Sequence, residues 1–125
     1  MKLRIHGNSL RLRLNQAEVA QFSKTGFFED SVQFAPGASL CYTLEACGQL
    51  ATAQALYQNG SIRIQIPRAD ADQWITTDRV SVAAEQPLSG GQPLSILIEK
   101  DFQCVHGEPE PHAYPNPLQD AASKS

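Results

Sequence analysis

The chain contains an internal repeat. Residues 2–25 and 54–77 align without a gap at an offset of 52 residues, and residues 40–44 align further along with residues 94–98. Between these blocks, residues 30–32 match residues 78–80. A repeat of this size is typical of a supersecondary unit that cannot bury its apolar face alone and packs against its copy. The sequence therefore predicts one domain over residues 1–102, made of two repeats at residues 1–46 and 53–100.

Each repeat begins with the pattern of a β-hairpin. Residues 2–6 and 10–14 alternate polar and apolar side chains on either side of a Gly-Asn-Ser turn, and residues 53–58 and 62–66 do the same around Asn-Gly-Ser. Two such period-2 runs around a short turn indicate a hairpin with one buried face. Further short strands are predicted at residues 32–34, 40–46, 80–84 and 94–99.

A helix is predicted after each hairpin. Asn15 can cap the first helix, with Glu18 placed to complete a capping box and Gly26 to end it. Pro67 suits the start of the second helix. Phe22 and Trp74 occupy equivalent helical positions and are predicted core anchors. The predicted fold class is mainly β (α+β), with two β-β-α-β-β units forming an intramolecular pseudo-dimer.

Composition fits a soluble protein. The chain has 125 residues, of which 42% are apolar and 18% charged, with no apolar run near the about 20 residues of a membrane span. We expect no signal peptide. The three cysteines form no C-x-x-C pair, which favours a reducing, cytoplasmic location without disulfides. Proline and acidic residues after about residue 107 predict that residues 103–125 form an extended or disordered tail. No cofactor is predicted.

The opening string MKLRIHGNSLRLRL resembles the start of MazE-type antitoxins and other AbrB/SpoVT-like proteins. The second unit also resembles this family, in which an Ile-Pro pair is followed by a helix and then by Asp-x-Val. The matching residues here are Ile66-Pro67 and Asp78-Arg79-Val80. This resemblance implies a swapped-hairpin β-barrel, with both copies in one chain. The opening and residues 99–104 also resemble a family of small bacterial proteins of unknown function, which implies no activity.

The AbrB/MazE resemblance implies a DNA-reading face on the first hairpin of each copy. By position it assigns nucleic-acid or polyanion binding to these side chains: Lys2, Arg4, Asn8, Ser9, Arg11, Arg13 and Arg63. Arg63 is the one cation on the second hairpin at these positions, so weak or lost DNA binding is expected. The expected function is a non-enzymatic binding or regulatory module, acting on DNA or an acidic protein partner, as a monomeric pseudo-dimer. The alternative is a protein-interaction domain without nucleic-acid activity. A metal-binding protein that uses the C-terminal Cys/His segment is the less favoured alternative.

The cations of the first hairpin would share one face if its strands pair across the turn. Lys2, Arg4, Arg11 and Arg13 would then repel one another unless an anion lies nearby. The face would either bind a polyanion or be a solvated surface that protects an exposed strand. A third possibility is that Glu108 and Glu110 of the tail fold back onto it.

Metal-ligating residue types gather only near the C-terminus. Asp101, Cys104, His106 and His112 could contribute to a zinc site, although their spacing matches no strong signature. Cys104 and His106 could share one face of an extended segment as nucleophile and base, but no oxyanion site accompanies them. We therefore predict neither a metal site nor an enzyme.

Overall fold

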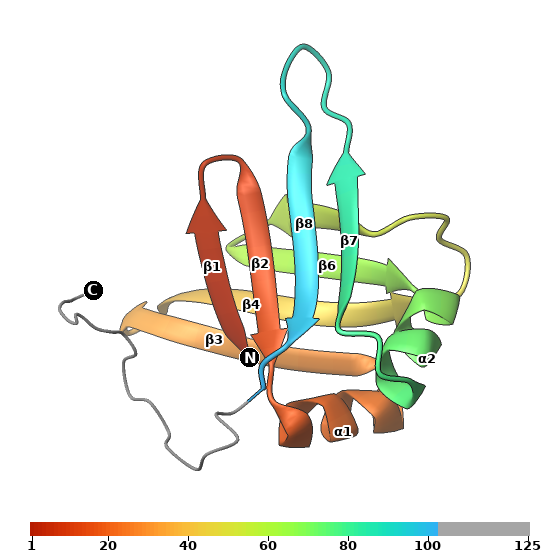
Figure 1. Cartoon of the computed structure of the whole chain (residues 1–125). Helices are drawn as coiled ribbons and strands as arrows, with labels where there is room; N and C mark the ends of the chain where they lie inside the picture. The colour runs from red at the N-terminus through yellow and green to blue at the C-terminus, as the bar shows by residue number, and fades with distance from the viewer. Residues whose placement is uncertain (103–125) are drawn as a thin grey trace, which may run out of the picture.

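The computed structural model describes residues 1–102, and these residues form a mainly β domain (Figure 1). Cys104, His106, His112 and the predicted tail lie outside the described residues. The elements follow one another as β1 (Lys2–His6), β2 (Ser9–Leu14), α1 (Gln16–Thr25), β3 (Phe27–Ala35), β4 (Ala38–Cys47), β5 (Gln54–Gln58), β6 (Ser61–Pro67), α2 (Arg68–Thr76), β7 (Ser81–Gln86) and β8 (Leu94–Lys100). No helix among the described residues is long and apolar enough to cross a membrane.

The strands form two four-stranded sheets, and each sheet combines strands from both halves of the chain. The strand order is β1-β2-β8-β7 in the first sheet and β3-β4-β6-β5 in the second. β2 pairs with β8, and β4 with β6, in parallel; the hairpin partners pair antiparallel. In Figure 1 the strands of one sheet cross those of the other, and both helices lie at one end. The mainly β prediction is confirmed.

The central parallel pairs use the same register. Leu10 of β2 lies opposite Ile96 of β8, and Ile62 of β6 lies opposite Tyr42 of β4. Leu10 and Ile62 are separated by 52 residues and Tyr42 and Ile96 by 54, as in the sequence alignment. The same alignment therefore matches the inward-pointing side chains of one sheet with the inward-pointing side chains of the other.

One block of the predicted alignment is wrong. Residues 78–80 precede β7, whereas their predicted counterparts, residues 30–32, lie within β3. Val32 pairs with Leu40, and the residue that pairs with Leu94 is Gln86. The counterpart of Val32 is therefore Gln86. The shared Asp-x-Val string misled the alignment, because strand register follows the side chains that face the core rather than matching letters.

β3 is also longer than the predicted residues 32–34. It spans nine residues, of which eight pair with β4, with an irregularity between Gln33 and Ala35. The sequence pattern did not predict the first part of this strand because acidic residues there interrupt the alternation of apolar side chains. Glu29 is exposed and Asp30 only half-buried, so a carboxylate at these positions keeps contact with water. The backbone ladder with β4 continues through them.

The interior confirms the predicted anchors. Phe22 and Trp74 are fully buried and meet edge to face, with ring centroids 6.1 Å apart. The Trp74 indole Nε1 donates a hydrogen bond to the Val80 carbonyl at 2.9 Å. A buried indole needs such an acceptor, so this bond fixes the chain between α2 and β7. The other large, fully buried side chains come from both sheets: Leu12, Leu14, Leu44, Ile64, Ile66, Ile96 and Ile98.

The predicted helix ends are confirmed in α1. Asn15 Oδ1 accepts from the Glu18 amide and Glu18 Oε1 accepts from the Asn15 amide, both at 2.9 Å, which completes the capping box. Gly26 ends the helix with φ of 75°, in the left-handed region that favours glycine. α2 begins directly after Pro67, which makes no side-chain cap.

Candidate functional site

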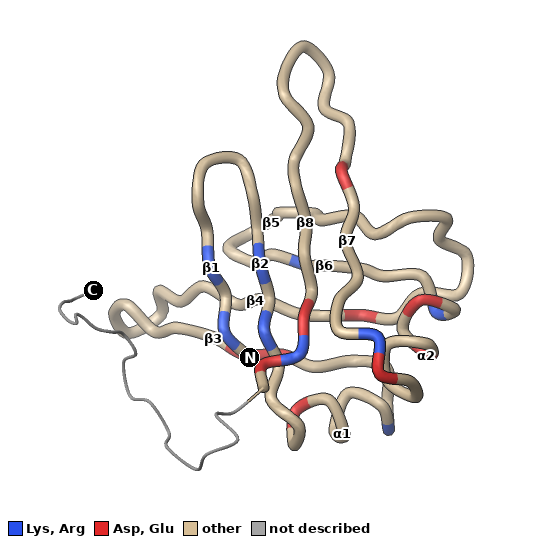
Figure 2. Tube along the Cα trace, in the orientation of Figure 1, with Lys and Arg blue, Asp and Glu red and all other residues tan. Residues whose placement is uncertain are grey.

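The candidate site is the outer face of β1 and β2, which we call the basic face: Lys2, Arg4, His6, Ser9, Arg11 and Arg13. The antiparallel register places Lys2 opposite Arg13, Arg4 opposite Arg11, and His6 opposite Ser9. These side chains alternate with Leu10, Leu12 and Leu14, which point inward. The predicted clustering of the first-hairpin cations on one face is therefore present. Figure 2 shows their positions in blue along the neighbouring strands β1 and β2.

Two carboxylates, one in β8 and one just after it, form ion pairs with three cations of the basic face: Lys2, Arg11 and Arg13. The parallel pairing of β2 and β8 places Glu99 opposite Arg13. Glu99 Oε2 lies 3.1 Å from Arg13 Nε and 3.4 Å from Arg11 Nε. Asp101, just beyond β8, lies 2.9 Å from Lys2 Nζ and 3.7 Å from Arg13 Nη2. The anions that stabilise this row are therefore Glu99 and Asp101.

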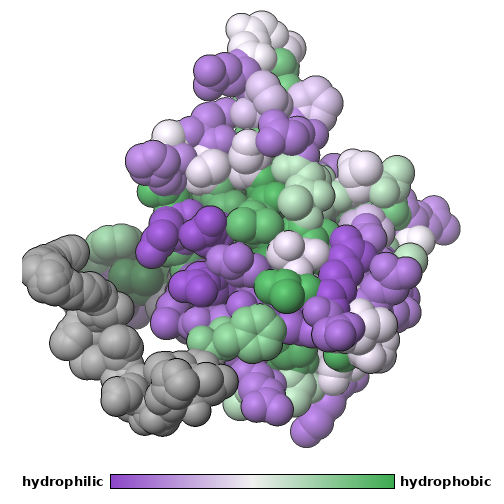
Figure 3. All heavy atoms as spheres, viewed as in Figure 1, coloured by the Kyte–Doolittle hydropathy of each residue, from purple (hydrophilic) through white to green (hydrophobic). Residues whose placement is uncertain are grey.

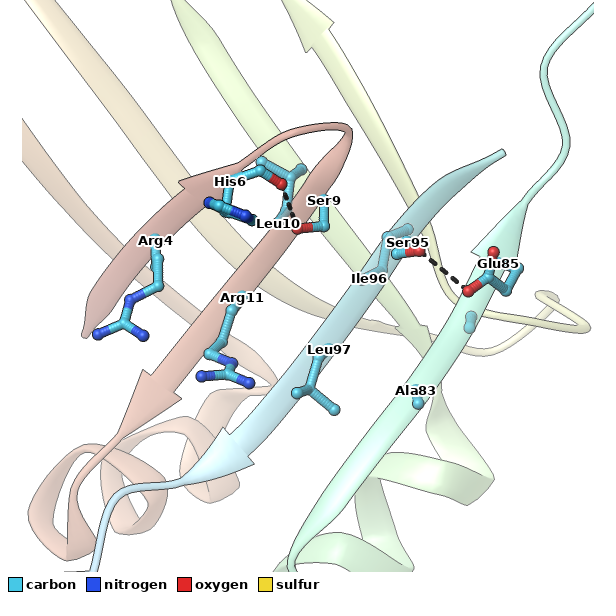
Figure 4. Close-up of a pocket in the computed structure, with 11 residues that line it drawn as sticks. Arg4, His6, Ser9, Leu10, Arg11, Ala83, Glu85, Ser95, Ile96 and Leu97 are labelled. Carbon is cyan, nitrogen blue, oxygen red and sulfur yellow. Dashed lines mark hydrogen bonds between the residues drawn. The ribbon is translucent and has the colours of Figure 1, made fainter. Parts of the chain in front are cut away.

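The end of the basic face nearest the β1–β2 turn, with Arg4 and His6, remains exposed to solvent. Among the described residues, no carboxylate lies within 4 Å of Arg4, and both Arg4 and His6 are exposed. In Figure 4 the guanidinium groups of Arg4 and Arg11 project from adjacent strands in the same direction. Two neighbouring guanidinium groups suit a carboxylate or phosphate, because each can donate two parallel hydrogen bonds.

A recess of about 560 Å³ adjoins these arginines and extends across β8 to β7. Leu97 and Ala83 provide its apolar centre, and Glu85 lies on the far side, where it accepts a hydrogen bond from Ser95 Oγ at 2.9 Å (Figure 4). Figure 3 shows hydrophilic surface over β1 and β2 beside apolar surface over β8 and β7. The recess can therefore hold a ligand that combines acidic and apolar groups.

Asn8 and Ser9 are predicted site residues whose polar groups make internal hydrogen bonds. Ser9 Oγ donates to the His6 carbonyl at 2.6 Å, and Asn8 Nδ2 donates to the Pro93 carbonyl at 3.1 Å. The first bond tightens the hairpin turn, and the second ties that turn to the loop before β8. Both side chains therefore position the hairpin that carries the arginines.

Arg63 lies in the other sheet, at the position that corresponds to Arg11. Its Nε and Nη2 donate to the two carboxylate oxygens of Glu45, each at 3.0 Å. Gln65 Nε2 donates to Glu45 at 3.1 Å, and Thr43 Oγ1 at 3.0 Å. The hydrogen bonds from Arg63 lower the pKa of Glu45, against the opposing effect of burial, with smaller contributions from Gln65 and Thr43. The structure does not bring Arg63 together with the first-hairpin cations.

The predicted metal and fold-back groups cannot be placed, since Cys104, His106, Glu108, Glu110 and His112 lie beyond residue 102. Within residues 1–102, no group of three or more His, Cys, Asp or Glu side chains is arranged to hold a metal ion.

Comparison with known proteins identifies the family of this chain. The profile of a protein family described as "Family of unknown function (DUF7009)" matches residues 1–118. No curated protein and no solved structure matches the chain. The AbrB/MazE resemblance therefore stays a prediction.

Proposed function

The chain belongs to this family of unknown function, and from the geometry of the basic face we propose that it is a non-enzymatic module that binds an acidic segment of a protein partner. The observation that carries this proposal is that carboxylates of the same domain pair with only some of the cations on the basic face. Glu99 and Asp101 already pair with Lys2, Arg11 and Arg13, two carboxylates against three cations. Arg4, beside Arg11, is exposed and has no carboxylate of residues 1–102 within 4 Å. A site with few available cations suits a few carboxylates better than a polyanion.

DNA is the less favourable ligand for electrostatic reasons. A duplex carries one negative charge per about 1.7 Å of its axis, and affinity rises with the number of phosphates that cations neutralise. Glu85, Glu99 and Asp101 lie on the same side of the sheet as the arginines and would repel phosphates that extend beyond Arg4. An acidic peptide can instead place one or two carboxylates at the arginines and apolar groups over Leu97.

The second candidate is a DNA-binding regulator related to the AbrB/MazE class, with weak affinity. Its support is that four cations share one outer face: Lys2, Arg4, Arg11 and Arg13. We also propose that the domain is an internally duplicated, swapped-hairpin pseudo-dimer. The common β-β-α-β-β order of the two halves and the matched registers of their parallel pairs support this assignment.

Binding experiments on the full-length protein distinguish these functions. The probes are a fluorescent peptide that alternates glutamate with valine and an unrelated 20-base-pair duplex, each titrated at about 50 and 200 mM salt. We expect the peptide to bind, Arg4→Glu to weaken it at least tenfold, and the duplex to bind less tightly. Lys24→Glu is the matched control, because it makes the same charge change at an exposed position on α1. Duplex binding that depends on Arg4, without peptide binding, would overturn the proposal in favour of the DNA regulator.

A further inference from the structure

Resting on that proposed function, we infer that the acidic partner binds as an additional β-strand along the free edge of β1. β1 is the first strand of its sheet and pairs with β2 alone among the described residues. A strand edge of this kind offers unpaired backbone N–H and C=O groups, and peptide recognition by strand addition uses such groups.

The register of the hairpin identifies which backbone groups are available. β1 and β2 are joined by a two-residue loop, and His6 pairs with Ser9 next to it. The pair beside such a loop is a hydrogen-bonded pair, and the pairs alternate from there along the ladder. Leu3 and Ile5 therefore fall in the non-hydrogen-bonded pairs, so their N–H and C=O groups point away from β2, toward the free edge.

The corresponding edge in the second half of the chain is bridged at Ala55. Gln86 of β7 reaches Ala55 of β5: its Oε1 accepts from the Ala55 amide at 2.6 Å, and its Nε2 donates to the Ala55 carbonyl at 3.2 Å. The amide side chain thus takes the place of a neighbouring strand. By the register, Leu3 is the counterpart of Ala55 and Val32 that of Gln86. Valine has no polar group with which to bridge the Leu3 backbone.

Side chains along β1 specify the chemistry of the added strand. Lys2, Arg4 and His6 lie on the outer face, while Leu3 and Ile5 lie on the other face. Ile5 is 61% exposed although it lies on the same side as the buried core residues. Residues directly opposite on adjacent strands have Cβ atoms about 4.5–5.5 Å apart. An added strand would therefore place acidic side chains opposite Arg4 and Lys2 and apolar ones beside Ile5, alternating along its length.

N-methylated peptides test this binding mode in the full-length protein. One version of the alternating Glu/Val peptide is N-methylated on its glutamates and the other on its valines, so that each loses the N–H groups of one edge. We expect their affinities to differ at least tenfold, because one edge alone faces β1. A peptide of the same composition with its glutamates contiguous should bind at least fivefold more weakly than the alternating one.

A side-chain variant provides a second measurement. Ile5→Ser should weaken binding of the alternating peptide several-fold, whereas Tyr57→Ser should leave it unchanged. Tyr57 is the matched control, since it is the counterpart of Ile5 in β5 and is 70% exposed. If both methylated peptides bind as tightly as the parent and Arg4→Glu still weakens binding, strand addition is overturned and the proposed function stands. If no peptide binds, the proposed function fails as well.

Discussion

The guanidinium of Arg63 donates one hydrogen bond to each carboxylate oxygen of Glu45, and both donor–acceptor distances are 3.0 Å. The pair occupies the outer face of the second sheet, at the positions that Arg11 and Glu99 occupy in the first. The Glu45 side chain is only 14% exposed and receives further hydrogen bonds from Gln65 and Thr43. It is therefore held mainly as the charged form.

This pair predicts a pH dependence of folding stability. The pKa of Glu45 is lower in the folded protein than the ordinary value of about 4.3, chiefly because of Arg63. A depressed carboxylate pKa contributes stability that is fully present above the unfolded pKa and is lost as the pH falls through the folded pKa. Glu45→Gln should therefore lower the urea midpoint at pH 7, and its effect should shrink below about pH 4. A difference that stays constant from pH 7 to pH 3 would contradict the assignment.

Glu99→Gln should strengthen polyanion binding. The change removes the carboxylate that lies nearest to Arg11 and Arg13 and frees the Arg11 guanidinium, while Arg13 keeps Asp101 at 3.7 Å. Each new phosphate contact should add about 0.9 to the magnitude of the slope of log affinity against log salt, so that magnitude should rise by about one. Heparin or duplex titrations between about 50 and 200 mM salt measure it. Glu29→Gln is the control, because it removes the same charge at an exposed position of β3, in the other sheet.

Trp74→Ala should destabilise the domain by about 3–5 kcal/mol, since it leaves a cavity against Phe22 at the centre of the core. Trp74→Phe keeps most of the ring but leaves the Val80 carbonyl without its donor. That variant should cost less, about 1–3 kcal/mol. Urea denaturation measures both, with the exposed Tyr57→Ala expected to stay within about 0.5 kcal/mol of wild type.

Gln86→Leu should destabilise the contact between β7 and β5. The substitution removes both hydrogen-bond partners of the partly buried Ala55 backbone, which should cost about 1–3 kcal/mol. The Ala55 amide should also exchange with solvent faster than in wild type. Gln58→Leu, on the exposed end of β5, is the control expected to change neither quantity. An unchanged exchange rate in Gln86→Leu would contradict the bridging role.

Local signals predicted much of the fold. Period-2 alternation located both hairpins, and Asn15, Glu18 and Gly26 located the ends of α1. Phe22 and Trp74 were identified as core anchors because equivalent positions on two amphipathic helices face the same interior. Such features depend on residues close together in the chain.

Features that depend on pairing between distant segments were missed. Glu99 and Asp101 were not assigned to the basic face, since only the parallel register of β2 and β8 brings them there. The bridge from Gln86 to Ala55 was missed because glutamine has no distinctive pattern in a strand. The repeat suggested which segments correspond, but residues 78–80 were misaligned because a short polar string outweighed the inward-facing side chains.

The parallel pairing of β2 with β8 also determines the order in which the two sheets can form during synthesis of the chain. All four strands of the second sheet come from residues 27–67, so that sheet can assemble while the ribosome is still translating. β2 must wait for residues 94–100, a delay on the order of ten seconds at about 10 residues per second. Throughout that interval the apolar side of the first hairpin lacks its partner, and the nascent chain is most vulnerable to aggregation there.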